Sequence, residues 1–145
     1  MVEPDTIKLL RECNAGVKMG VTSLDEVIDK VKDEKLKKIL TDSKQEHEKL
    51  GGETSQLLLD YSDKGKEPNP IAKGMSWMKT TVMMSMKEDT DKEAAKLISD
   101  GCNMGIQSLS EYLNKYQAAE EKVKDITKKL IKIEDELAHS LREFL

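Results

Sequence analysis

Glu136 and His139 have the spacing that most resembles a chemical motif, because Glu136-Leu137-Ala138-His139 reads Glu-x-x-His. Helical bundles that hold a di-iron or di-manganese centre take such a pair from each of two helices and a further Glu from each of the other two. Carboxylates and imidazoles are suitable ligands for these metals. The chain has two histidines, and the other, His47, is followed by Glu48. The candidate metal ligands are therefore His47, Glu48, Glu136 and His139.

Helical phase argues against such a centre. At about 100° per residue, and with Leu130 and Leu137 setting the inward direction, Glu136 falls roughly 100° from the stripe centre and His139 nearly opposite it. Acidic residues of the other helices are also expected to project away from the core: Glu12, Glu26, Asp100 and Glu111. Most ligands of a di-metal centre are thus missing or misdirected. We expect no cofactor, with iron or manganese as the alternative.

His47 differs from these residues because it lies on an apolar stripe. We interpret it as a partly buried histidine bonded to a nearby hydroxyl or carbonyl, with a ligand or a proton-responsive switch as the alternative. Cys13 and Cys102 also point inward, and buried thiols pack as small hydrophobes. A thiol site shared with His47 would need that histidine level with the cysteines. Folding back about the first turn instead places His47 near Met19.

A cluster of methionines lies between residues 71 and 86, comprising Met75, Met78, Met83, Met84 and Met86. Thioethers bind Cu(I), so a copper site is one interpretation. Methionine is also a flexible filler of aromatic-poor cores, which we favour. Trp77 and Met84 would lie on the face of this helix opposite its main apolar face. We expect them to meet a second subunit, which makes a homodimer the default assembly.

These residues must be positioned by helices, because the apolar periodicity is helical throughout and no strand is predicted. Helices are expected at 5–31, 33–62, 71–86, 90–116 and 120–145. The residues Thr90-Asp91-Lys92-Glu93 read as a capping box that opens the fourth of them. Gly51-Gly52 would weaken or kink the second. Lys64 to Pro70 is the strongest break, so two hairpins (5–62 and 90–145) flank a crossover (63–89).

The two hairpins echo each other. Cys13-Asn14-Ala15-Gly16 is repeated as Cys102-Asn103-Met104-Gly105, and Lys37-Lys38-Ile39-Leu40 resembles Lys128-Lys129-Leu130-Ile131. Two matches in the same order indicate an internal duplication. Similar helical hairpins joined by a long crossover predict an all-α, ferritin-like, up-down-down-up four-helix bundle, with the short helix in its crossover.

The chain also resembles a bacterial ferritin-like family of unknown function. The resemblance rests on three segments: Leu9-Leu10-Arg11-Glu12-Cys13-Asn14-Ala15-Gly16, Val31-Lys32-Asp33-Glu34-Lys35-Leu36-Lys37, and a histidine followed by Leu50-Gly51-Gly52. In the second half it rests on the Cys-x-x-Gly of the fourth helix and the late histidine. It implies the bundle fold and carries no established activity.

Composition bounds the remaining possibilities. A length of 145 residues favours one domain, 1–145. Charged residues make up 36% of the chain and aromatic residues 3%, a composition typical of amphipathic helices. A net charge of −4 with interleaved Lys and Glu predicts no nucleic-acid partner. No apolar run of about 18 residues is present, so we expect no membrane span and a cytoplasmic location.

The function expected from the sequence is that of a non-catalytic structural or protein-interaction module with a degenerate metal site and an unidentified protein partner. A di-iron or di-manganese oxidase or metal-storage protein is the alternative. Cu(I) binding through the methionine cluster is the less favoured third reading.

Overall fold

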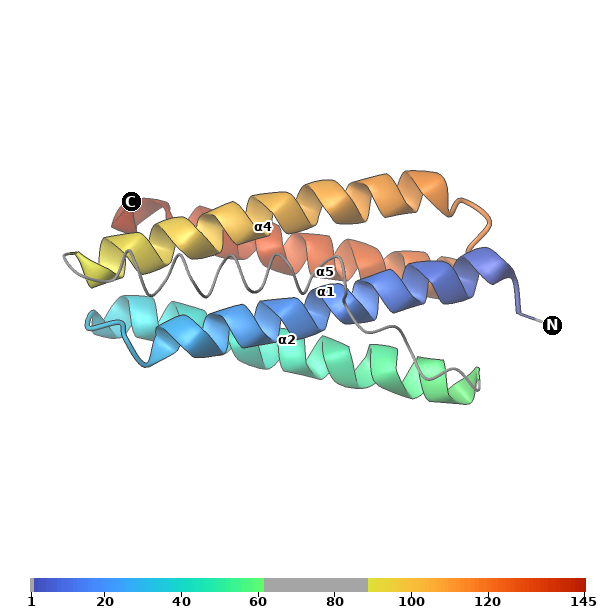
Figure 1. The fold of residues 1–145 in the computed structure, drawn as a ribbon, viewed down its shortest axis with the longest axis horizontal. Helices are drawn as coiled ribbons and strands as arrows, with labels where there is room; N and C mark the ends of the chain where they lie inside the picture. Colours follow the sequence, from blue (N-terminus) through green and yellow to red (C-terminus); the bar gives the residue numbers. More distant parts are fainter. Residues whose placement is uncertain (1, 62–88) are drawn as a thin grey trace.

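The computed structural model describes residues 2–61 and 89–145, and all its regular structure there is helical (Figure 1). The helices are α1 (Pro4–Ile28), α2 (Glu34–Asp60), α4 (Thr90–Lys115) and α5 (Glu121–Ser140), followed by the short 3-10 helix η1 (Arg142–Phe144). The prediction of an all-α four-helix bundle is therefore confirmed. The helix expected at 71–86, with Trp77, Met84 and the other clustered methionines, lies outside the described residues.

Hydrogen bonds between the turns fix the direction of each helix. At one end, the Asp91 carboxylate accepts from the backbone N–H groups of Lys32 (2.7 Å) and Asp33 (3.0 Å), which joins the start of α4 to the α1–α2 turn. At the other end, the Thr6 hydroxyl accepts from the Glu120 N–H at 2.9 Å, which joins the start of α1 to the α4–α5 turn. Helices α1 and α5 thus run one way, and α2 and α4 the other, as Figure 1 shows.

Helix packing follows from these directions. Helix α1 packs against α2 and α4, and α5 packs against the same two helices from the other side, so neighbours around the bundle are antiparallel. Helix α1 also contacts α5 across the centre. Helices α1 and α5 thus each contact three others, and the buried face of α1 is correspondingly wide.

The caps explain where the helices begin. Pro4 opens α1, a position at which its missing N–H costs nothing. The Asp33 side chain caps α2 by accepting from the Leu36 N–H at 2.9 Å. The cap of α4 is Asp89, whose carboxylate accepts from the Lys92 N–H at 3.1 Å, and Thr90 is already helical. The capping box expected at Thr90 was therefore misplaced by one residue.

Gly51 and Gly52 do not interrupt α2, which is helical from Glu34 to Asp60. The helix is continuous there, and Gly51 serves packing. A Cβ atom at this position would stand 2.9 Å from Cγ1 of Val17, so the missing side chain lets α1 and α2 approach closely. Tertiary packing outweighs the low helix propensity of the pair.

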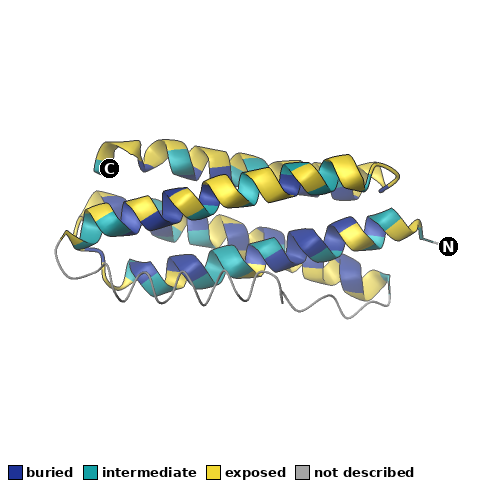
Figure 2. Cartoon of the chain, turned by 45° about the horizontal axis from the view of Figure 1, so that its top comes forward, coloured by how far each residue is buried: buried dark blue, intermediate teal, exposed yellow. Residues whose placement is uncertain are grey.

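Buried positions recur along each of the four long helices (Figure 2). The buried apolar residues form two clusters, one toward each end of the bundle. Leu24, Leu36 and Leu40 belong to the cluster at the α1–α2 turn. Leu9, Leu57 and Leu130 belong to the cluster at the other end. Along α2, the buried residues between Leu40 and Leu50 are Ser43 and His47, so polar side chains occupy the middle of the bundle.

Candidate functional site

The four candidate metal ligands do not come together. His47 is buried, with 1% of its surface exposed, whereas Glu48, Glu136 and His139 are exposed. The predicted solvent exposure of Glu136 and His139 is thus confirmed. In residues 2–61 and 89–145, no group of three His, Cys, Asp or Glu side chains could hold a metal ion. Iron, manganese and copper binding remain predictions that metal analysis of the purified protein would test.

The orientation predicted for the other acidic residues is right for Asp100 and Glu111, which are exposed, and wrong for Glu12. Glu26 is half-buried. Glu12 is buried and hydrogen-bonded to the Tyr112 hydroxyl, and burial together with the Glu12 carboxylate raises the pKa of Tyr112. The prediction failed because α1 contacts three helices, so its buried face is wider than the single stripe through Val17 and Leu24.

The hydrogen bond to Ser43 shows which ring nitrogen of His47 carries a hydrogen. Nδ1 of His47 lies 2.7 Å from the Ser43 backbone carbonyl oxygen. A carbonyl oxygen can only accept, so we infer that Nδ1 carries a hydrogen and donates it. In the neutral ring, Nε2 is then an acceptor, and it lies 3.9 Å from Oε1 of Glu134. The predicted burial and carbonyl partner of His47 are both confirmed.

Glu134 was missed by the sequence analysis, which set the inward direction of the last helix by Leu130 and Leu137 and did not consider the acid between them. The structure buries Leu130, Glu134 and Leu137, whereas Ile133 is only half-buried. Position 134 follows Leu130 by four residues and precedes Leu137 by three, which places it on the same helix face. That spacing was the sequence signal that could have predicted the burial of Glu134.

The Glu134 carboxyl group is held in an unusual environment for an acid. The residue is 7% exposed, and its Oε2 atom has no hydrogen-bond partner in the described structure. Burial raises the pKa of Glu134, and the interaction with His47 partly offsets this. An isolated buried carboxylate is costly, so burial favours the protonated form of the Glu134 carboxyl group.

Each member of this pair fits against a glycine of a facing helix. A Cβ atom at Gly20 of α1 would stand 2.8 Å from Cδ2 of His47. A Cβ atom at Gly105 of α4 would overlap Oε2 of Glu134. The imidazole and the carboxyl group thus fill space that the two glycines leave open.

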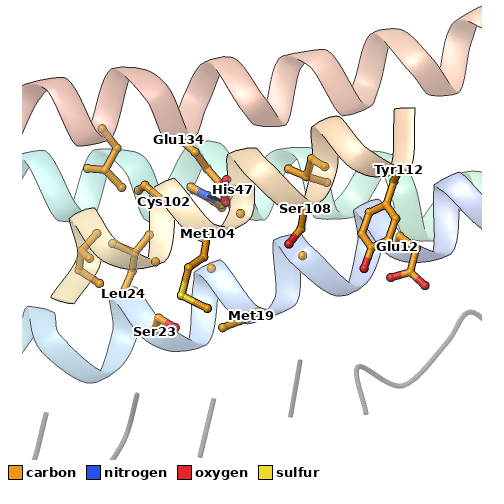
Figure 3. A pocket seen from close by; sticks show the side chains of 17 residues that line it. Glu12, Met19, Ser23, Leu24, His47, Cys102, Met104, Ser108, Tyr112 and Glu134 are labelled. Atoms are coloured by element: carbon orange, nitrogen blue, oxygen red, sulfur yellow. Dashed lines mark ion pairs between the residues drawn. The ribbon is translucent and has the colours of Figure 1, made fainter. Parts of the chain in front are cut away.

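A cavity of about 240 Å³ lies between α1 and α4, and His47 and Glu134 line it from the other two helices (Figure 3). Small residues account for its volume, because Gly16 and Gly20 on α1 and Gly101 and Gly105 on α4 all line it. The remaining lining residues are Glu12, Met19, Ser23, Leu24, Ile98, Cys102, Met104, Ser108, Leu109, Tyr112 and Leu137. One of its lining residues, Met104, is 52% exposed.

The two cysteines are free and buried, as predicted. Burial raises the pKa of Cys13 to about 12 even though Thr127 hydrogen-bonds to it, and burial also raises the pKa of Cys102. The charge of Glu134 raises the pKa of both. Cys102 lines the cavity together with His47, which lies at the level of Gly20, next to Met19 as expected. Both sulfurs are therefore neutral thiols.

No family model, curated protein or solved structure matches the chain. Among the described helices, none combines the length and the apolar character that crossing a membrane requires.

Proposed function

We propose that this chain is a non-catalytic, ferritin-like bundle that works as a binding module and takes a small, largely apolar molecule into the cavity between α1 and α4. The observation that carries the proposal is the cavity itself, whose volume is about 240 Å³. Apolar cavities of roughly 150 Å³ in protein cores are large enough for benzene. The space therefore suits a molecule somewhat larger than one aromatic ring.

The lining supports binding more than catalysis. Ligand pockets combine apolar walls with a few polar groups that fix orientation. Here Leu24, Ile98 and Leu137 supply apolar wall, and His47 with Glu134 supplies the polar group. Nucleophilic catalysis by cysteine requires a thiolate. The raised pKa of Cys102, the cysteine in the cavity, opposes its ionisation.

A filled cavity tests the proposal. Gly16→Leu places a side chain in the cavity, and its Cβ would have only ordinary contact, 3.7 Å, with Cδ2 of Leu130. Gly52→Leu is the matched control. It makes the same substitution in α2, at a position where an added Cβ would have no atom within 4 Å. Ligand-detected NMR with benzene, toluene and indole should show binding to the unmodified protein and to Gly52→Leu, and little to Gly16→Leu. Absence of binding by all three, or equal binding by Gly16→Leu, would contradict the proposal.

The predicted assembly is a separate proposal. We infer a homodimer through Trp77 and Met84, because a helix that is apolar on two sides needs two partners. Replacing both residues with Glu should give a folded monomer by light scattering, and an unchanged mass would count against the dimer. The internal duplication likewise stays a proposal, supported by the Cys13 and Cys102 segments of the two hairpins.

A further inference from the structure

Among the described residues, the charged side chains that line the cavity are both acidic. Glu12 and Glu134 line it at separate places, Glu12 next to Tyr112 and Glu134 next to His47 (Figure 3). No Lys or Arg is among the described residues that line it. A site with acidic groups and low-dielectric walls attracts a cation and opposes an anion.

Glu134 is the polar group that a ligand in this cavity would meet. Its side chain is 91% buried, because 9% of its surface is exposed, and Oε2 has no partner within the described structure. Its other oxygen, Oε1, faces His47 at 3.9 Å, which is longer than a hydrogen bond. A buried acceptor without a donor costs free energy that a donor on a ligand would recover.

We propose that the cavity binds an amine cation carried on an apolar group, with the ammonium donating to Glu134 and the apolar group lying between α1 and α4. This deepens the proposed function and rests on it. Before binding, burial favours the protonated form of Glu134. The ammonium replaces that proton, which leaves to solvent, while His47 keeps its bond to the Ser43 carbonyl. One positive charge enters and one leaves, so the net charge of the buried site is conserved.

The titratable groups around Glu134 permit this exchange. His47 faces it from α2, and the Cys13 and Cys102 thiols interact with it electrostatically from α1 and α4. Because both thiols are neutral, Glu134 is the source of the released proton. The apparent affinity for an amine should therefore rise with pH, by up to about tenfold per unit, while the free protein still holds that proton.

Three probes of nearly equal shape separate the possibilities: 2-phenylethylamine, neutral 2-phenylethanol and anionic 3-phenylpropanoate. Titration calorimetry should rank the amine first. Measured at several pH values, and at each in buffers with different ionisation enthalpies, it should show proton release that rises toward one per amine bound as the pH falls below the raised pKa of Glu134. If the alcohol or the anion binds as tightly as the amine, or if no proton is released, the amine assignment is wrong while the binding cavity stands. If none of the three binds, and benzene, toluene and indole also fail, the proposed function is itself wrong.

Glu134→Gln keeps the shape of the side chain and removes its charge. It should lower the amine association constant about 10- to 100-fold and leave that of 2-phenylethanol nearly unchanged. Glu136→Gln is the matched control, because Glu136 is exposed on the same helix, and it should change neither. Equal amine binding by Glu134→Gln would overturn the assignment. If this variant does not fold, the probe ranking and the proton release of the unmodified protein decide.

Discussion

At the scale of single residues, the closest fit in the site is that between Gly20 and His47. The hypothetical Cβ of residue 20 lies 2.8 Å from Cδ2 and 3.1 Å from Nε2 of the ring, closer than carbon atoms normally approach. The ring is 1% exposed and hydrogen-bonded to Ser43 at 2.7 Å, so it has little freedom to move away. A single methyl group at position 20 should therefore displace the His47 ring and disturb its interaction with Glu134.

Gly20→Ala should lower the free energy of unfolding by about 1–3 kcal/mol, because overpacking a tight core forces side chains or backbone to shift. Gly52→Ala is the control, since a Cβ there meets nothing within 4 Å, and it should raise stability by about 0.5–1 kcal/mol. Urea denaturation followed by circular dichroism measures both. Equal stabilisation by the two substitutions would mean that the ring does not press against Gly20.

Glu134 gives a pH dependence whose sign is fixed by its burial. Burial raises the pKa above its ordinary value of 4.5, so the folded protein holds this proton more tightly than the unfolded chain. Its contribution to stability is complete below pH 4.5 and is lost as the pH rises through the raised pKa.

Glu134→Gln should remove this dependence. The unfolding free energy of the unmodified protein minus that of Glu134→Gln should fall between pH 4.5 and 8, by up to about 1.4 kcal/mol per pH unit in the titrating range. Urea unfolding across this range measures the difference. Both proteins contain all the other acidic residues, so the contributions of those residues cancel in the difference. A difference that grows with pH would show that the folded state favours the carboxylate.

At the scale of elements, the sequence predicted what local chemistry decides. Helix α2 follows Asp33 and α4 begins within one residue of the expected capping box, because Asp caps and apolar periodicity are local signals. Packing partners are not local. Glu12 was placed wrongly and Glu134 was overlooked, because a stripe drawn through apolar residues alone excludes acids, whereas the wide buried face of α1 and the spacing of α5 include them.

Asp91 shows how one side chain positions two elements. Its carboxylate at the start of α4 accepts from two backbone N–H groups of the α1–α2 turn, at 2.7 and 3.0 Å. Asp91→Ala removes the acceptor of both N–H groups and should lower the free energy of unfolding by about 1–2 kcal/mol. Asp91→Asn keeps one acceptor and should cost less. Asp100→Ala, at an exposed position on the same helix, should stay within about 0.5 kcal/mol of the unmodified protein in the same urea experiment. Equal effects of the two alanine substitutions would mean that the hydrogen bonds to Asp91 do not stabilise the fold.

At the scale of the whole molecule, the cavity depends on all four helices at once, which is why the sequence did not predict it. Gly16 and Gly105 were noticed as part of the repeated Cys-x-x-Gly segments, but spacing along one helix cannot show that two glycine pairs face each other. The split of the core into two clusters is likewise visible only in three dimensions. The cavity lies beside the polar layer between them, where His47 and Glu134 replace apolar packing.

The cavity should make the two cysteines unequal toward a small reagent. Cys102 lines the cavity and is 5% exposed, whereas Cys13 is fully buried and does not line it. Methyl methanethiosulfonate is small enough to enter, so it should modify Cys102 several times faster than Cys13 in the folded protein, as read by peptide mass spectrometry. Both reactions should be slow and should accelerate with pH, because the raised pKa of each thiol limits the thiolate.

Filling the cavity distinguishes entry from unfolding. In Gly16→Leu, modification of Cys102 should slow to the rate of Cys13, because only opening of the bundle then exposes the sulfur. Gly52→Leu should keep the difference, since its side chain projects into open space. Equal rates for Cys13 and Cys102 in the unmodified protein would instead show that reagents reach both thiols only when the bundle opens. The cavity would then be closed to ligands on the timescale of the reaction, so this one comparison links the exposure of a sulfur atom to the binding role proposed for the whole bundle.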